Sequence, residues 1–186
     1  MLSEAELEAL FDDFKDETFR METLDRYAVS SENERLNRYL SGEPLEIEPA
    51  TREWLEFMAE EISSGKRWYK VHILRSPISE YLRFECEWGY AVSSQYGQEV
   101  FILDEAEHAR PEGVPDEDFW LFDDGKVALL RYDDGGRFLG AELVDGAGAD
   151  AYRGYRDAVM EAAEPFAAWW DRHPEYRREN WLGSRP

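Results

Sequence analysis

The chain has 186 residues, of which 43% are hydrophobic and 15% aromatic, a composition that favours a folded domain with a sizeable core over general disorder. Its 42 acidic and 21 basic residues give a net charge of −21, which repels phosphate backbones and argues against direct binding to nucleic acid. A basic protein is the partner that such a chain is expected to attract, although an acidic surface also serves simply to keep a protein soluble.

The first half of the chain is predicted to mix helices with strands, because apolar residues recur first at helical and then at alternating spacing. In chain order the predicted elements are a helix at 3–14, a strand at 18–24, a helix from a Ser31–Glu34 capping box to Gly42, a helix from Thr51 to Gly65 and a strand at 68–74. The helix from Thr51 is expected to bury Trp54, Leu55, Met58 and Ile62.

A helix is predicted directly after the 68–74 strand. Ser76-Pro77 has the pattern of an N-cap serine followed by proline at the first helical position, and the helix is expected to reach about Tyr90. The next strand is predicted at 99–103. The order strand, helix, strand indicates one right-handed parallel unit.

Glu85 stands out within this helix because it falls near the middle of the apolar arc on a helical wheel. A carboxylate on an apolar face must be paired, protonated or open to a cleft. One interpretation is a buried ion pair that fixes the helix to a strand, with Arg75, Arg20 or His72 as partner; the other is a carboxylate that faces a ligand. The candidate ligand-binding residues are Glu85, Tyr81, Arg83, Arg75, Arg20 and Trp120.

Two Asp-Asp-Gly triplets, at 123–125 and 133–135, separate three apolar runs. Asp-Gly between such runs is typical of hairpin turns, so the region is predicted to form a three-stranded antiparallel meander. Successive turns of a meander lie at opposite ends of the sheet, roughly 25 Å apart at 3.3 Å per residue. The four carboxylates are therefore not expected to share a metal ion, and neither a metal nor another cofactor is predicted.

No catalytic residue is predicted from motifs. The three histidines, His72, His108 and His173, lie far apart without metal-ligand spacing, and nucleophile-elbow and phosphate-loop patterns are lacking. A nucleophile pair of Cys86 with His72 is conceivable, but a thiol on the packed face of a helix is usually inert.

The last segment, 165–186, is rich in Trp and Arg and is predicted to be a helical extension of a main domain at 1–164. It is expected either to bind a partner through exposed aromatic rings or to dock on the core with its arginine heads in water. Pro165 is expected to kink or restart the preceding helix.

A cytoplasmic location is expected. The single cysteine forms no disulfide within the chain, no stretch approaches the ~20 apolar residues of a membrane span, and the acidic N-terminus lacks the pattern of a signal peptide.

Together these patterns predict an α+β (or α/β) fold in a single domain, with a mixed, twisted sheet of about six strands and helices packed on it. The meander supplies the antiparallel part of the sheet, and the unit around Glu85 supplies the parallel part. The sequence does not indicate an oligomeric state.

Three segments, 19–29, 71–87 and 118–143, resemble an uncharacterised actinobacterial family, a domain of unknown function. Members of that family are often encoded beside Xre-type helix-turn-helix regulators, so the resemblance implies a role near transcriptional control. The residues that match its pattern are Arg20, Glu22, Tyr27, Tyr81, Arg83, Glu85, Asp118, Trp120, Asp123 and Asp124. The resemblance attaches no catalytic role to any of them.

Three hypotheses for the function follow. The first is a non-enzymatic regulatory or interaction protein that associates with a helix-turn-helix regulator and senses a small ligand near Glu85. The second is an enzyme of unknown reaction that uses a buried Glu/Arg pair. The third is a toxin–antitoxin component whose acidic surface covers a basic partner.

Overall fold

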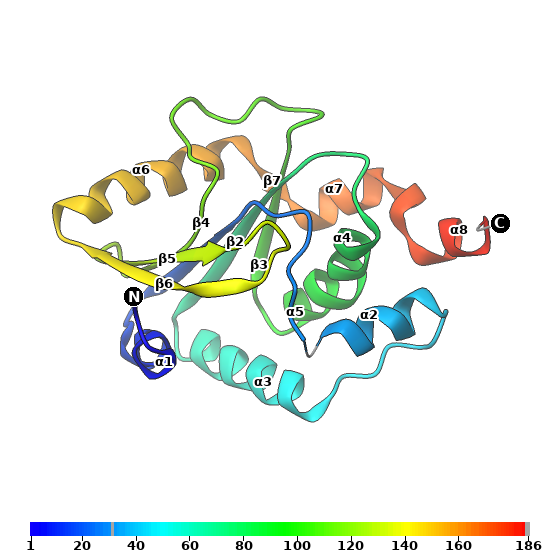
Figure 1. The fold of residues 1–186 in the computed structure, drawn as a ribbon, viewed down its shortest axis with the longest axis horizontal. Coiled ribbons are helices and arrows are strands. Elements are labelled where there is room, and N and C mark those ends of the chain that lie inside the picture. Colours follow the sequence, from blue (N-terminus) through cyan, green and yellow to red (C-terminus); the bar gives the residue numbers. More distant parts are fainter. Residues whose placement is uncertain (31, 185–186) are drawn as a thin grey trace.

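The computed structural model describes residues 1–30 and 32–184 and builds them around a seven-stranded mixed sheet with strand order β6-β5-β4-β1-β2-β3-β7 (Figure 1). The strands are β1 (Glu17–Glu22), β2 (Arg67–Leu74), β3 (Glu99–Asp104), β4 (Asp118–Phe122), β5 (Lys126–Tyr132), β6 (Phe138–Asp145) and β7 (Glu164–Pro165). β2 pairs in parallel with β1 and β3, and the remaining pairs are antiparallel. The predicted α+β class, the meander and the parallel pairing of β2 with β3 are confirmed.

The sheet has one strand more than expected, because β7 is only two residues long and shows no alternation along the sequence. β7 pairs with β3 at the edge of the sheet, a position that tolerates Pro165 since proline has no N–H for a second neighbour. Pro165 also restarts the helix, as predicted.

Helices cover both faces of the sheet. They are α1 (Glu4–Asp13), α2 (Glu32–Leu40), α3 (Pro49–Ser63), α4 (Glu80–Phe84), α5 (Ala91–Gln95), α6 (Ala147–Ala162), α7 (Phe166–Arg172) and α8 (Arg178–Trp181), with a π-helical segment η1 (Glu85–Tyr90) between α4 and α5 and 3₁₀ turns η2 (Pro174–Tyr176) and η3 (Leu182–Ser184). α6 lies on one side of the sheet, and α1, α3 and α5 lie on the other (Figure 1). The Ser31 cap expected before α2 lies outside the described residues. None of the helices within those residues is both long enough and apolar enough to cross a membrane.

Successive side chains of a strand point to opposite faces of the sheet, and the two faces have different surroundings. On β1, Phe19 and Met21 point to α6, where they pack in one apolar cluster with Val159. Arg20 and Glu22, between and beyond them, point to the opposite face. That opposite face carries the polar and aromatic residues from which the candidate site is built.

Both Asp-Asp-Gly triplets form turns, as predicted. Asp123 and Asp124 have φ of 48° and 57°, and the Gly125 N–H donates to the Phe122 carbonyl over 3.0 Å. Positive φ at both central residues is the geometry that tight hairpins require. The first turn closes the Lys126 end of β5 and the second follows its Tyr132 end, so the two pairs of carboxylates do not form one site.

The helix after β2 begins later than predicted. Ser79, not Ser76, is the N-cap, and its Oγ accepts the Leu82 N–H over 3.1 Å. Ser76 is instead held by Asp104, whose carboxylate accepts both its N–H and its hydroxyl. The prediction failed because Asp104 lies at the end of a neighbouring strand, 28 residues away in the chain.

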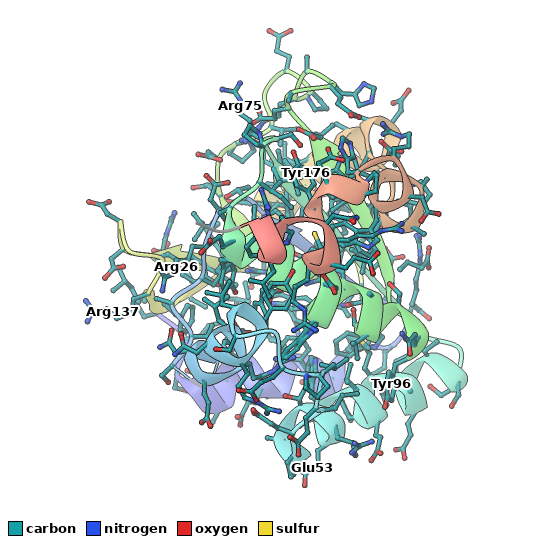
Figure 2. The ribbon with its side chains drawn as sticks, turned by 90° about the vertical axis from the view of Figure 1, so that its right-hand side faces the viewer. Arg26, Glu53, Arg75, Tyr96, Arg137 and Tyr176 are labelled. Atoms are coloured by element: carbon teal, nitrogen blue, oxygen red, sulfur yellow. The ribbon has the colours of Figure 1, made fainter. Side chains whose placement is uncertain are left out.

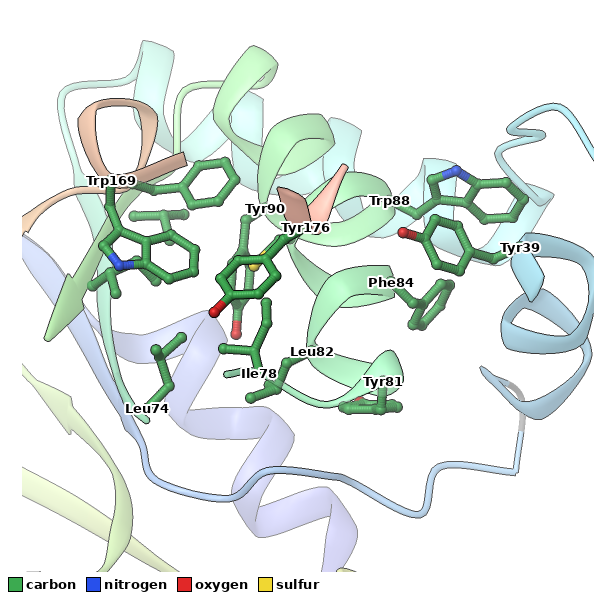
Figure 3. Packing of buried hydrophobic residues seen from close by; sticks show 14 of the residues in the cluster. Tyr39, Leu74, Ile78, Tyr81, Leu82, Phe84, Trp88, Tyr90, Trp169 and Tyr176 are labelled. Carbon is green, nitrogen blue, oxygen red and sulfur yellow. The ribbon is translucent and has the colours of Figure 1, made fainter. Parts of the chain in front are cut away.

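The C-terminal segment docks on the core. Trp169 and Tyr176 are buried in the same apolar cluster as Trp88 and Tyr90, which Figure 3 shows between the sheet and α2. Trp181 packs against that cluster from its edge. Of the two expectations for this segment, docking on the core describes its arrangement up to residue 184.

Candidate ligand-binding site

A pocket of about 420 Å³ lies on the side of the sheet that faces away from α6. α2, the start of α3 and the segment from η1 to α5 form its walls, and β2 and β4 contribute from the sheet. Its lining combines carboxylates, cations and indole rings, chiefly Glu32, Arg35, Glu48, Trp54, Lys70, Glu85, Trp88 and Trp120. This is the size and mixed character of a small-molecule site.

The register of the sheet fixes the part of the pocket that strands provide. Arg20 of β1 stands opposite Lys70 of β2 and Trp120 of β4, so the three side chains leave the same face side by side. The Arg20 guanidinium carbon is 5.5 Å from the centre of the Trp120 ring, a cation–π contact that orients the indole.

Next to these side chains, Asp118 accepts four hydrogen bonds. Its carboxylate accepts from Arg20 Nη2 at 2.7 Å, from the Tyr27 hydroxyl at 2.6 Å and from the Thr23 N–H and hydroxyl at 2.9 and 2.8 Å. Arg20 and Asp118 are both buried. A buried ion pair with this many hydrogen bonds holds its geometry tightly, because breaking any part of it leaves a charge unpaired.

Glu22 is the second buried anchor of this face. It accepts from Lys70 Nζ at 2.9 Å and from the Tyr90 hydroxyl at 3.1 Å. Burial opposes its ionisation, but the positive charges of Lys70 and Arg20 outweigh burial and lower the pKa of Glu22 to about 2. The charge of Lys70 is therefore balanced inside the protein, although Lys70 also lines the pocket.

His72 completes the buried network. Burial lowers the pKa of His72, its Nε2–H donates to the Leu24 carbonyl over 3.1 Å, and its Nδ1 lies against the Tyr90 hydroxyl. His72 thus ties β2 to η1 and to the segment after β1, and its nitrogens are occupied by those bonds.

Glu85 differs from these anchors because its carboxyl has neither a hydrogen bond nor an ion pair with any residue that the structure describes. It is half-buried, opens η1 and faces the pocket. Burial, and next the negative charge of Glu32, raise the pKa of Glu85 to about 8. Gly89 makes room for it, since a Cβ at that position would lie 3.1 Å from Glu85 Oε2.

Glu32 and Arg35 reach the pocket from α2. Glu32 accepts the Tyr81 hydroxyl over 2.8 Å, and burial raises its pKa. Arg35 is buried; its Nη2 donates to the Trp88 carbonyl over 3.3 Å, and its guanidinium lies over the Phe84 ring. η1 and α2 together therefore place two weakly satisfied carboxyl groups at one pocket.

The residues proposed from the sequence separate into two groups. Glu85 and Trp120 line the pocket, Tyr81 positions Glu32, and Arg20 supports Trp120 from below. Arg83 turns away, toward the rings of Tyr176 and Trp181 at 5.1 and 4.8 Å. Arg75 is exposed and lies at the opposite end of the molecule from Glu53 of α3 in Figure 2.

The arginine or histidine partner expected at Glu85 is not there. Arg20 is taken by Asp118 and His72 by Leu24 and Tyr90, and Arg75 lies on another part of the surface. A further correction concerns Trp54, expected inside but 42% exposed beside the pocket. Helical periodicity predicts neither the missing partner of Glu85 nor the exposure of Trp54, because both depend on which strand or helix packs beside the residue.

Sequence reasoning missed Glu32, Arg35 and Lys70. Lys70 carried a signal, because it alternates with Trp68 and His72 along a strand and so shares their buried face. Glu32 and Arg35 carried none that distinguishes them from the other charges of an acidic, half-exposed helix.

Two further groups of reactive side chains have their members buried or bonded within the protein, among the residues that the structure describes. Cys86 is buried, which raises the pKa of its thiol, and His72 is engaged elsewhere, so the conceivable pair is not formed. Asp104, Glu107 and His173 bring three possible metal ligands together. Their side chains are already bonded within the protein, Asp104 to Ser76 and Glu107 to Arg172 and His173.

Fold and pocket together define an α+β protein with a ligand-sized site on the polar face of its sheet. The chain belongs to the family described as Domain of unknown function (DUF6879), whose family model matches residues 5–171. This agrees with the resemblance to a family of unknown function noted from the sequence. No curated protein and no solved structure matches the chain.

Proposed function

We propose that this protein is a non-enzymatic regulatory protein that senses a small molecule in the pocket at Glu85. The observation that carries the proposal is the Glu85 carboxyl, which faces the pocket without a partner among the described residues although it is half-buried. Burial raises the pKa of this carboxyl to about 8, which shows that its charged form is poorly stabilised by the protein. A ligand that donates hydrogen bonds to Glu85 would supply the stabilisation that its neighbours do not.

The surroundings of Glu85 support binding over chemistry. Most groups of the neighbouring polar network bond one another, although Arg20 Nη1 is enclosed without a partner, and these bonds hold the pocket wall of Trp120, Lys70 and Tyr90 in place. Rigid walls favour selective binding because little conformational freedom is lost when a ligand enters.

A test begins with native mass spectrometry of the protein purified from its natural host, to detect a retained small molecule. Trp54→Ala is expected to lose that molecule, whereas Leu143→Ala is expected to keep it. The two side chains are similarly exposed, 42% and 45%, but only Trp54 lines the pocket. The absence of any retained molecule, together with no thermal stabilisation of the protein by metabolite mixtures, would overturn the proposal.

The regulatory part of the proposal concerns a partner. The net charge of −21 favours a basic protein, and the resemblance to an actinobacterial family encoded beside Xre-type genes favours a cytoplasmic helix-turn-helix regulator. Affinity purification from the native host tests it, with salt titration of the complex as the readout of charge. Recovery of such a regulator supports the proposal; recovery of a basic toxin instead would favour the toxin–antitoxin alternative and contradict it.

An enzyme remains the second candidate, and one observation favours it. A pKa of about 8 places Glu85 where a general acid or base works near neutral pH. The same mass spectrometry separates the two, because an enzyme converts the retained molecule with time at pH 7 to 8 while a sensor returns it unchanged. Conversion that Glu85→Gln abolishes would establish the enzyme.

A further inference from the structure

We infer that the pocket takes an organic ammonium ion, a protonated amine with an apolar or aromatic body, and that Glu85 and Glu32 receive its N–H groups. The inference rests on the proposed function, because it names the ligand class of the same pocket.

The pocket offers acceptors. Glu85 receives no hydrogen bond from a described residue, and the bond found at Glu32 comes from the Tyr81 hydroxyl on Oε2. Glu48 adds a third carboxylate to the lining. An ammonium group carries three donors and no acceptor, which is the complement of such a set.

The pocket has two cations, Lys70 and Arg35, against three carboxyl groups. Lys70 Nζ bonds Glu22 at 2.9 Å and lies 4.9 Å from the centre of the Tyr90 ring. Arg35 Nε lacks a partner but is fully enclosed, so a ligand cannot reach it. Arg35 is then the one cation of the pocket without a carboxylate partner among the described residues, and an anionic ligand that approached it would also meet Glu85, Glu32 and Glu48.

The walls suit the body of such a ligand. Trp54, Trp88 and Trp120 line the pocket, and the 42% exposure of Trp54 leaves indole surface open to an occupant. Indole rings attract ammonium groups through their electron-rich faces and also bury apolar carbon.

A divalent metal ion fits less well. Neither Glu32 nor Glu85 belongs to a described group of three carboxylate, histidine or cysteine ligands close enough to hold a metal. An ammonium ion needs no such convergence, since each N–H can reach a different acceptor.

Binding is expected to release a proton. The charged and titratable groups around Glu85 are Glu22 of β1, Lys70 of β2, Glu32 and Arg35 of α2, Glu48 before α3, Tyr81 of α4 and Tyr90 of η1. Burial and Glu32 hold the pKa of Glu85 at about 8, so the carboxyl is protonated at pH 7. An ammonium ion favours the charged carboxylate, and the affinity should rise between pH 6 and pH 8.

The experiment is titration calorimetry with three probes of similar shape: 2-phenylethylamine as the cation, 2-phenylethanol as the neutral analogue and phenylacetate as the anion. We expect the amine to bind and to release protons, measured as a dependence of heat on buffer ionisation. Glu85→Gln should weaken amine binding about tenfold or more, because a charge-assisted hydrogen bond is lost. Glu53→Gln, an exposed carboxylate on α3, is the matched control and should bind as the natural protein does.

If Glu85→Gln does not fold, Glu32→Gln replaces it in the same titration and should also weaken amine binding. Binding of phenylacetate or phenylethanol as tightly as the amine would overturn the ammonium inference and leave the pocket as a ligand site. A retained natural ligand without a cationic nitrogen would do the same. If no probe binds and no ligand is retained, both the inference and the proposed function fail.

Discussion

On β1, Phe19 and Met21 enter an apolar layer against α6, while Arg20 and Glu22, on the other side of the same strand, enter a network of charges and hydroxyl groups. The α6 face is closed by side chains that need only match in volume. The pocket face is held together by directional hydrogen bonds and ion pairs. Glu85 lines the pocket on that face without such a bond from any described residue. Buried polar groups stabilise a fold less than well-packed apolar ones, so the two faces contribute to stability in different ways.

The difference also concerns what each face tolerates. Apolar packing adapts to another side chain of similar volume, whereas a hydrogen-bonded ion pair does not accept even an isosteric change that reverses a donor or removes a charge. Substitutions of equal size on the two faces therefore separate them.

The largest effect is expected from Asp118→Asn. The amide keeps the shape but removes the charge opposite Arg20 and places an NH₂ group among four donors, so unfolding free energy should fall by about 3–5 kcal/mol. Urea unfolding followed by tryptophan fluorescence measures it. Asp116→Asn, on an exposed neighbour, is the control and should change stability by less than about 1 kcal/mol. A similar small change at Asp118 would show that the two faces do not differ as described.

On the α6 face, Met21→Ala should lower the unfolding free energy by about 2–5 kcal/mol, because it opens a cavity in a fully buried cluster. Met21→Leu, which keeps the volume, should cost less than about 1.5 kcal/mol. The same unfolding measurement applies. Equal losses for Ala and Leu would mean that this face also depends on specific contacts rather than on volume.

The smallest expected effect is the pH dependence of stability that Glu85 causes, which distinguishes it from the paired carboxylates on the same face of the sheet. Its pKa of about 8 in the folded protein exceeds the ordinary 4.5, so the folded state holds a proton that the unfolded state has lost between these pH values. Stability should therefore fall as pH rises from 4.5 to 8, on the order of 2 kcal/mol after allowance for solvent screening.

Glu85→Gln removes this pH dependence, and Glu53→Gln should leave it in place. Denaturant unfolding at pH 5 and pH 8 gives the comparison. Glu22 contributes with the opposite sign and in a lower window, since its pKa of about 2 makes stability fall as the solution is acidified below about pH 4.5. A profile for Glu85→Gln as steep as that of the natural protein would contradict the assignment of the raised pKa to Glu85.

Local patterns predicted several elements well. The Asp-Asp-Gly triplets mark turns, with positive φ at Asp123 and Asp124 in the first and at the following Gly136 in the second, and the apolar run of β2 specifies a buried strand. The position of Glu85 on an apolar arc also pointed to an unusual carboxyl before any neighbour was known. These features are decided within a few residues of chain.

The helix start and the ion pairs could not be predicted in this way. Ser76 lost its cap role to Asp104, and Arg20 found Asp118 rather than Glu85, over separations of 28 and 98 residues. The choice among possible partners depends on the strand order β4-β1-β2-β3, which no local pattern encodes.

The sequence by itself determined the class of fold, the meander with its turns, the acidic surface and the presence of a carboxyl on an apolar helix face, because backbone preference, side-chain period and net charge are local or additive. The tertiary structure decided that Glu85 has no partner among the described residues, that Glu32, Lys70 and three indoles line the same pocket, and that Arg83 and Arg75 do not. A pocket exists only where separate elements meet. Its chemistry is therefore set by the packing of β1, β2 and β4 against α2 and η1.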